Sequence, residues 1–267
     1  MQRTLSFTSF LSRMGAALLA ATLLAAVAAV PAAAQGAVNV YGPGGPLPAM
    51  KEAAAAFGQK HGVTVTVTAG PTPQWLDKAK ADADVVFSGA ENMMTDFIKA
   101  MEGRIVEETV EPLYLRPSVI LVRPGNPKAI TGIRDLLQPG RTVMVVHGAG
   151  QVALWEDIVG RTGDIAAVKA FRRNIVATAP NSAEATKLWS ERPEIDAWII
   201  WNIWNAADRT PTDVVPVEPE LRIWRDTGVA LTRQGAEKAA ARDFVAFLKS
   251  PDGKAIFAKY GWVEKAG

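Results

Sequence analysis

The sequence contains no cysteine, so disulfide bonds, thiolate nucleophiles and zinc–thiolate sites are excluded. It has two histidines, His61 and His147. It also lacks a G-x-S-x-G nucleophile elbow, an H-E-x-x-H zinc motif and a Walker loop. A hydrolase built on His147 is left as the enzymatic alternative. We expect a binding protein that carries out no reaction and holds no cofactor and no metal.

No apolar run after residue 34 approaches the roughly 20 residues of a transmembrane helix. Before it, Arg3 and Arg13 precede an alanine-rich apolar stretch that ends in Pro31 and three alanines. This order is typical of a secretory signal peptide, with an uncleaved membrane anchor as the alternative. We predict cleavage between Ala34 and Gln35. The mature protein, 233 of the 267 residues, is then periplasmic and not embedded in the membrane.

The mature chain has no excess of either charge. Both arginines of the predicted signal peptide are lost on cleavage, which leaves 27 basic residues from 29 against 27 acidic ones. A net charge of zero gives no support to a nucleic-acid partner. An anionic ligand would have to be held by local geometry.

Short runs of β-branched residues alternate with helical stretches along the mature sequence, which is typical of an α/β fold with mostly parallel sheets. Turn signals near 122–128 and 218–224 predict two lobes joined by a hinge, with a ligand cleft between them. The predicted divisions are a signal peptide over 1–34, a first lobe over 35–122 and 223–267, and a second lobe over 123–222.

Four predicted helices begin directly after a strand and a small or polar loop, at 42–45, 70–72, 147–150 and 180–182. Ligands bind outside the carboxyl ends of such strands, and helix N-termini attract anions. The alternative is a set of ordinary capped helices. Thr72 before Pro73, Ser88 with Glu91, and Asn181 with Glu184 have the spacing of N-caps.

The sequence Gly148-x-Gly150-x-x-Ala153 resembles a dinucleotide fingerprint, but two helices are predicted to follow it where the fingerprint requires a second strand. We interpret its glycines as positions where the backbone closely approaches a small ligand.

Two further residues are candidate donors. Trp201 ends the apolar run 195–201 beside Asn202, so its indole N–H either faces the cleft or lies in the core. Arg116 precedes the strand expected at 119–122 and either reaches the cleft or is an exposed arginine before Pro117.

Several segments resemble type II periplasmic solute-binding proteins of the sulfate/molybdate class. LVRPGNPKAITGIRDLLQPG (121–140) is similar to the lobe-crossing strand of that class, and SPDGKAIFAKYGW (250–262) to its C-terminal helix. VYGPGGPLPAMKEAAAAF (40–57) and AGPTPQWLDKAKADADVVFSGAENMMTDFI (69–98) more narrowly resemble the accessory colonisation factor C subfamily.

The resemblance implies that backbone N–H groups, hydroxyls and an indole bind a tetrahedral oxyanion or a small dicarboxylate such as aspartate. It places the first loop on Gly44 and Gly45, a hydroxyl on Thr72, and the indole on Trp201. His147 stands where the class has a serine. With neighbouring polar side chains, the candidate ligand-binding set is Gly44, Gly45, Thr72, Gln74, Trp75, Ser88, Arg116, His147, Gly148, Gly150, Gln151, Asn181, Ser182, Trp201 and Asn202.

The resemblance implies a monomeric receptor that delivers its anion to the membrane component of an ABC transporter. The alternative is a sensor or colonisation-related module that uses the same cleft without transport.

Overall fold

Successive side chains of the first strand, β1 (Val38–Gly42), alternate between two separate hydrophobic clusters. Val38 and Val40 belong to the larger cluster and Tyr41 to the smaller one. Strand β3 (Val85–Phe87) repeats this alternation. Because neighbouring side chains of a strand point to opposite faces, the sheet is covered on both sides.

The computed structural model describes residues 36–206 and 211–266, and their strands form one mixed sheet. The remaining strands are β2 (Val65–Ala69), β4 (Glu111–Val122), β5 (Val143–Val146), β6 (Ile175–Ala179), β7 (Ala197–Trp201), β8 (Asp213–Pro216) and β9 (Trp224–Leu231). The strand order is β2-β1-β3-β9-β4-β7-β5-β6, and β8 pairs with β4. Pairs are parallel on both sides of the sheet, β1 with β2 and β3, and β5 with β6 and β7. Every pair that includes β4 or β9 is antiparallel.

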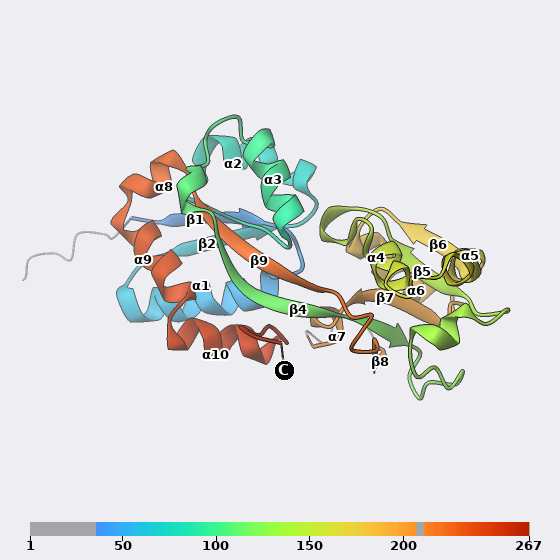
Figure 1. The fold of residues 1–267 in the computed structure, drawn as a ribbon. Helices are drawn as coiled ribbons and strands as arrows, with labels where there is room; N and C mark the ends of the chain where they lie inside the picture. The colour runs from blue at the N-terminus through green and yellow to red at the C-terminus, as the bar shows by residue number, and fades with distance from the viewer. Residues whose placement is uncertain (1–35, 207–210, 267) are drawn as a thin grey trace, which may run out of the picture. The chain divides into compact units, whose positions relative to one another are not determined.

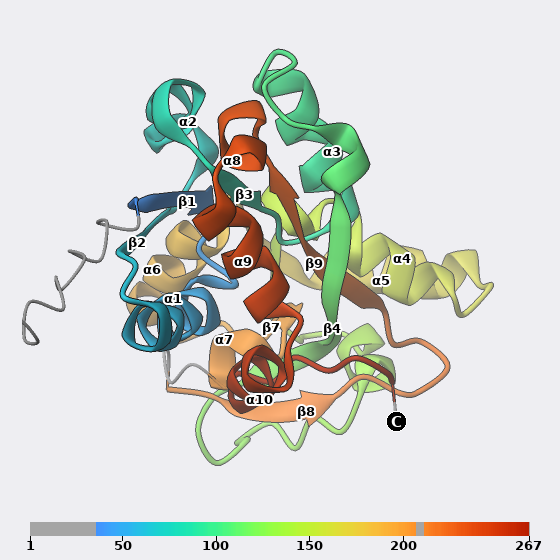
Figure 2. The same ribbon diagram turned by 90° about the vertical axis from the view of Figure 1, so that its left-hand side faces the viewer.

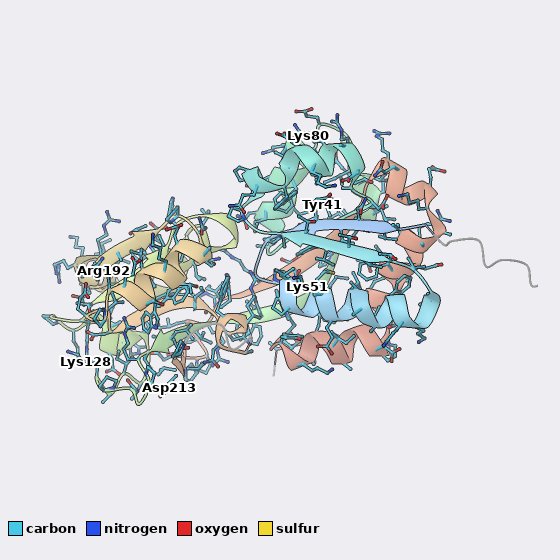
Figure 3. The ribbon with its side chains drawn as sticks, turned by 180° about the vertical axis from the view of Figure 1, so that it is seen from behind. Tyr41, Lys51, Lys80, Lys128, Arg192 and Asp213 are labelled. Carbon is cyan, nitrogen blue, oxygen red and sulfur yellow. The ribbon has the colours of Figure 1, made fainter. Side chains whose placement is uncertain are left out.

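Helices cover both faces of the strands β1 to β3 (Figures 1 and 2). Helices α2 (Leu76–Asp82) and α3 (Glu91–Ala100) lie on one face. Helices α1 (Leu47–His61), α9 (Ala239–Leu248) and α10 (Pro251–Lys259) lie on the other. Figure 3 shows the same layers in its labelled side chains, with Tyr41 and Lys80 on the side of α2 and Lys51 on α1.

The strands β5 to β7 have their own helices. These are α4 (Leu154–Gly160), α5 (Ile165–Asn174), α6 (Ser182–Glu191) and the short α7 (Ile203–Ala206). Strand β7 is buried at every residue, as its continuous apolar sequence predicts for a strand covered on both faces. The short 3-10 helices are η1 (Thr72–Gln74), η2 (Glu107–Thr109), η3 (Ile133–Leu137) and η4 (Ala149–Gln151), and α8 (Arg233–Glu237) precedes α9.

Strand β4 connects the two groups of strands. Its first part, Glu111–Pro117, pairs with β9, and its second part, Ser118–Val122, pairs with β7. The predicted division after residue 122 coincides with the end of β4, and the division after residue 222 lies just before β9. These lobe boundaries and the hinge remain predictions.

Three local predictions were wrong. Thr72 does not cap a helix, because 72–74 form a 3-10 turn and Trp75 separates it from α2. Ser88 does not cap α3, because its hydroxyl oxygen accepts the N–H of Gly228 in β9, and Ala90 is the residue before the helix. The helix expected from Gln151 begins at Leu154, because Ala153 has a left-handed backbone conformation, with φ of 59°.

The predicted signal peptide and its cleavage site before Gln35 lie outside the described residues. Within them, we find no helix that combines the length and the hydropathy needed to span a membrane.

Candidate functional site

The carboxyl ends of the parallel strands point toward one cavity. The loops after β1, β2 and β3 contribute residues to its wall, and so do those after β5, β6 and β7. This is the position at which α/β sheets generally bind ligands. The cavity encloses ≈ 650 Å³ including its opening to solvent. It is lined by Pro43, Gly44, Gly45, Pro46, Gly70, Pro71, Thr72, Gly89, Met93, Arg116, Gly150, Gln151, Asn181, Ser182, Ala183, Trp201, Ile203 and Trp204.

Arg116 supplies the positive charge of this wall and is only 2% exposed. Its Nη1 donates a hydrogen bond of 2.6 Å to the carbonyl oxygen of Asp226, and its Nη2 donates one to the carbonyl oxygen of Gly89. Its Nε has no hydrogen-bond partner among the described residues. The alternative of an exposed arginine before Pro117 is therefore wrong.

The charge of Arg116 has no paired acid. Within residues 36–206 and 211–266, no carboxylate oxygen lies within 4.0 Å of its guanidinium nitrogens. Burial lowers the pKa of Arg116 to about 9, although the Asp226 carboxylate counteracts this shift. Arg116 thus remains charged at neutral pH. Because Asp226 makes no ion pair with Arg116, it offsets only part of the several kcal/mol that burying such a charge costs.

The guanidinium carbon of Arg116 lies over two indole rings. It lies 4.6 Å from the ring centroid of Trp201 and 4.7 Å from that of Trp262. The Trp201 side chain is fully buried, and its Nε1 has no hydrogen-bond partner among the described residues. The two alternatives for Trp201 do not exclude each other, because its ring belongs to the hydrophobic core and also lines the cavity.

Neutral donors complete the wall. The Asn181 side chain caps α6 by accepting the N–H of Glu184 at 3.0 Å, as predicted. The first N–H groups of α6 belong to Ser182 and Ala183, and such groups have no carbonyl partner within their own helix. The buried Ser182 hydroxyl donates to Gln151 Oε1 at 3.1 Å, which joins two loops of the wall.

Close backbone contact fixes the loop around η4. A Cβ atom on Gly150 would lie 3.0 Å from the carbonyl oxygen of Gly89 and 3.4 Å from Arg116 Nη2. Arg225 on β9 donates to the carbonyl oxygens of Gly150 and Val152, at 3.2 and 3.1 Å. Our interpretation of Gly148 was wrong, because a Cβ there would meet the carbonyl oxygen of Pro180 at 2.0 Å. The close approach at Gly148 is to protein backbone.

The structure brings nine of the fifteen predicted residues to the cavity. The others do not line it: Gln74, Trp75, Ser88, His147, Gly148 and Asn202. The indole of Trp75 packs on Phe97 and donates to the carbonyl oxygen of Gly70 at 3.1 Å. The Asn202 amide donates to the carbonyl oxygen of Gly261 at 2.8 Å. Gln74 and His147 are exposed.

Sequence reasoning missed several residues of the wall. Met93 and Gly89 follow β3, and Ile203 and Trp204 follow β7. Their position after a strand of the parallel set was a signal for a place at the ligand site. However, residues without polar side chains are also expected at such positions when they only pack in the core. Among the described residues we find no group of three or more His, Cys, Asp or Glu side chains placed to hold a metal ion.

A family model described as bacterial extracellular solute-binding protein matches residues 38–263. The match covers most of the chain and includes every residue that lines the cavity.

Solved structures share the fold. A crystal structure of L-phospholactate-bound PEB3 is 37% identical and covers 85% of this chain and 100% of its own, with a TM-score of 0.81. One of Peb3 from Campylobacter jejuni is 36% identical with the same coverage and a TM-score of 0.80. The periplasmic molybdate-binding protein of Azotobacter vinelandii is 18% identical over 86% of this chain and 100% of its own, with a TM-score of 0.66. The predicted α/β periplasmic-binding-protein fold is thereby confirmed.

A relative also appears among curated proteins. The sulfate-binding protein of Escherichia coli (strain K12) is 27% identical over 191 residues. The alignment covers 60% of this chain and 56% of that protein, so the chain spans little more than half the length of this relative.

Proposed function

We propose, since this chain belongs to the bacterial extracellular solute-binding protein family, that it captures a small anion with a tetrahedral oxyanion group in the cavity beside Arg116. Members of this family bind solutes and are not enzymes, which removes the hydrolase alternative. His147 is also exposed and does not line the cavity.

The observation that carries the proposal is a pair of unsatisfied buried groups at one wall. Arg116 is a buried cation that makes no ion pair within the described residues, and the Nε1 of Trp201 beside it is a buried donor without an acceptor among them. An unsatisfied buried donor costs about 1–3 kcal/mol. A bound anion would supply both the missing negative charge and the missing acceptor.

The neutral donors around Arg116, and not its own fork, favour a tetrahedral group over a planar carboxylate. A bidentate pair with a carboxylate uses two parallel N–H groups of the guanidinium fork. In Arg116 each terminal nitrogen uses one of its two N–H groups for the carbonyl oxygen of Asp226 or Gly89, and the Nε–H has no partner among the described residues, so this fork remains available. The preference for a tetrahedral group therefore rests on the single neutral donors of the other loops, which suit oxygen atoms in a tetrahedral arrangement.

Related proteins support the same ligand class. Sulfate, molybdate and L-phospholactate occur in the names of these proteins and complexes, and each of these ligands contains a tetrahedral oxyanion group. The apolar side chains of Met93, Ile203 and Trp204 lie in the same cavity, and its volume leaves room for an organic group beside the oxyanion. We therefore include small phosphate esters among the expected ligands.

As the biological role, we propose that the protein works in the periplasm and delivers its anion to an ABC transporter. The same proposal includes that the protein is a two-lobed monomer and that it resembles the accessory colonisation factor C subfamily. Sensing without transport would use the same cavity.

The test is a ligand panel measured by thermal shift and calorimetry on the mature chain. We expect sulfate, molybdate, phosphate or L-phospholactate to raise the melting temperature. A ligand at 100 times its Kd adds about 2.7 kcal/mol to the free energy of unfolding. Aspartate should have no effect, and chloride at matched ionic strength is the control.

The Arg116→Gln variant tests the wall itself. It should remove the stabilisation by the oxyanion while the free protein keeps its circular dichroism spectrum. A panel in which only aspartate binds would replace the proposal with a dicarboxylate receptor. A panel in which no anion binds would overturn it.

A further inference from the structure

A second aromatic ring, from a residue that follows α10, contacts the Arg116 guanidinium. Trp262 is 2% exposed, and its ring centroid lies 4.7 Å from the guanidinium carbon. Its ring packs edge-on against Phe257 of α10, with centroids 6.2 Å apart. Trp262 does not line the cavity, whereas Trp201 does, so Trp262 contacts the cation from outside the lining.

The segment that carries Trp262 is attached to the residues next to both cavity groups. Leu115, the neighbour of Arg116, donates its N–H to the carbonyl oxygen of Val263 at 2.7 Å and accepts that residue's N–H at 2.9 Å. Asn202, the neighbour of Trp201, donates to the carbonyl oxygen of Gly261 at 2.8 Å. The residues on both sides of Trp262 are therefore fixed to β4 and to the end of β7.

Gly261 allows this attachment. Its φ is +82°, and a Cβ atom there would lie 2.6 Å from the Asn202 amide nitrogen. Only glycine adopts this conformation without strain and leaves room for the amide.

We propose that Trp262 is a positioning residue, which holds the Arg116 guanidinium flat against Trp201 so that its charge faces the anion. The proposal rests on the function proposed above. Two electron-rich rings partly compensate a buried cation that makes no ion pair among the described residues, and such contacts are stronger where water is excluded. Without the Trp262 ring, water reaches the space that the ring fills and the long arginine side chain gains other rotamers.

The first measurement needs no anion. In NMR spectra of the anion-free protein, the Arg116 Nε–H should exchange slowly with water in the wild type, because the atom is buried. Trp262→Leu should accelerate this exchange at least about tenfold, as expected when a contact of this kind is lost. The control is Trp155→Leu, since Trp155 is 7% exposed and stacks on Phe171 at 5.4 Å in the other group of strands.

The second measurement is the Kd for sulfate and for L-phospholactate by calorimetry. Trp262→Leu should weaken binding about tenfold, and Trp262→Phe, which keeps an aromatic face, should recover most of the loss. Trp155→Leu should lower the melting temperature and change the Kd less than about twofold. If Trp262→Leu fails to fold, fluorinated tryptophans at position 262 keep the ring shape and weaken its cation contact, so affinity should fall with each added fluorine.

The outcomes separate the two proposals. Unchanged Nε–H exchange in Trp262→Leu, or unaltered affinity across the fluorinated series, would overturn the positioning role. If wild-type protein binds neither sulfate nor L-phospholactate nor any other oxyanion of the panel, the proposed function fails, and the exchange measurement still decides whether Trp262 holds Arg116.

Discussion

The guanidinium carbon of Arg116 lies 4.6 Å from the ring centroid of Trp201, and each residue has a buried nitrogen without a hydrogen-bond partner among the described residues. The two side chains come from β4 and β7, which pair antiparallel with Ser118 opposite Trp201. The cation and the neutral donor are therefore positioned by one strand pair. Their separation does not depend on a flexible loop.

Trp201→Phe separates the two roles of this indole. Phenylalanine keeps an aromatic face for Arg116 but removes Nε1, so the affinity for an oxyanion should fall by about 1–3 kcal/mol. Calorimetry with sulfate and L-phospholactate measures the change. Trp198→Phe is the matched control, because Trp198 is fully buried on the same strand and does not line the cavity, and its Nε1 also has no hydrogen-bond partner among the described residues. Equal losses in both variants would indicate that Trp201 contributes only to packing.

The pKa of Arg116 predicts an alkaline limit to binding. Burial lowers this pKa to about 9, and the anion is attracted only to the charged form. Affinity should therefore be constant near neutral pH and fall as the pH rises through about 9, by up to tenfold per pH unit. Calorimetric Kd values for sulfate across this range test the prediction, with circular dichroism to confirm folding. Trp201→Phe, which keeps Arg116, should show the same alkaline fall. An affinity that stays level well above this pH would contradict the assigned role of Arg116.

The site residues that come directly after a strand could be predicted from the sequence. Gly44, Gly150 and Ser182 each follow an apolar run, in the loop before a helical stretch or in its first turn, and parallel strands bring such ends to the same edge. The capped start of α6 was also predictable, since Asn181 and Glu184 have the spacing of a cap and the Asn181 oxygen accepts the N–H of Glu184.

The remaining contacts depend on residues far apart in the sequence. Ser88 has the same capping pattern as Asn181, but β9 lies beside it and the N–H of Gly228 takes its hydroxyl oxygen. The prolines at 112 and 117 hid the first part of β4, because proline usually argues against a strand. Trp262 gave no local signal, since only the bridge between Leu115 and Val263 brings it to Arg116.

The cap of α6 links helix stability to ligand binding. Asn181→Ala removes the side chain that accepts the N–H of Glu184, which should cost about 1 kcal/mol of stability. It should also weaken oxyanion binding several-fold, because the first turn of α6 carries Ser182 and its free N–H groups at the cavity wall. Melting temperature and sulfate Kd are both measured. Asp164→Ala is the matched control, since Asp164 caps α5 by accepting the N–H of Ala166 at 2.7 Å and does not line the cavity.

The two variants should be similar in stability and different in affinity. A cap contributes to the free energy of unfolding wherever its helix lies, but it orders donors for the anion only at the cavity. If both variants bind sulfate as the wild type does, the N-terminus of α6 does not contact the ligand, and Arg116, Trp201 and the loop after β1 hold the anion without it. If both lose affinity equally, the loss reflects general destabilisation. Loss in Asn181→Ala alone supports direct binding by the start of α6.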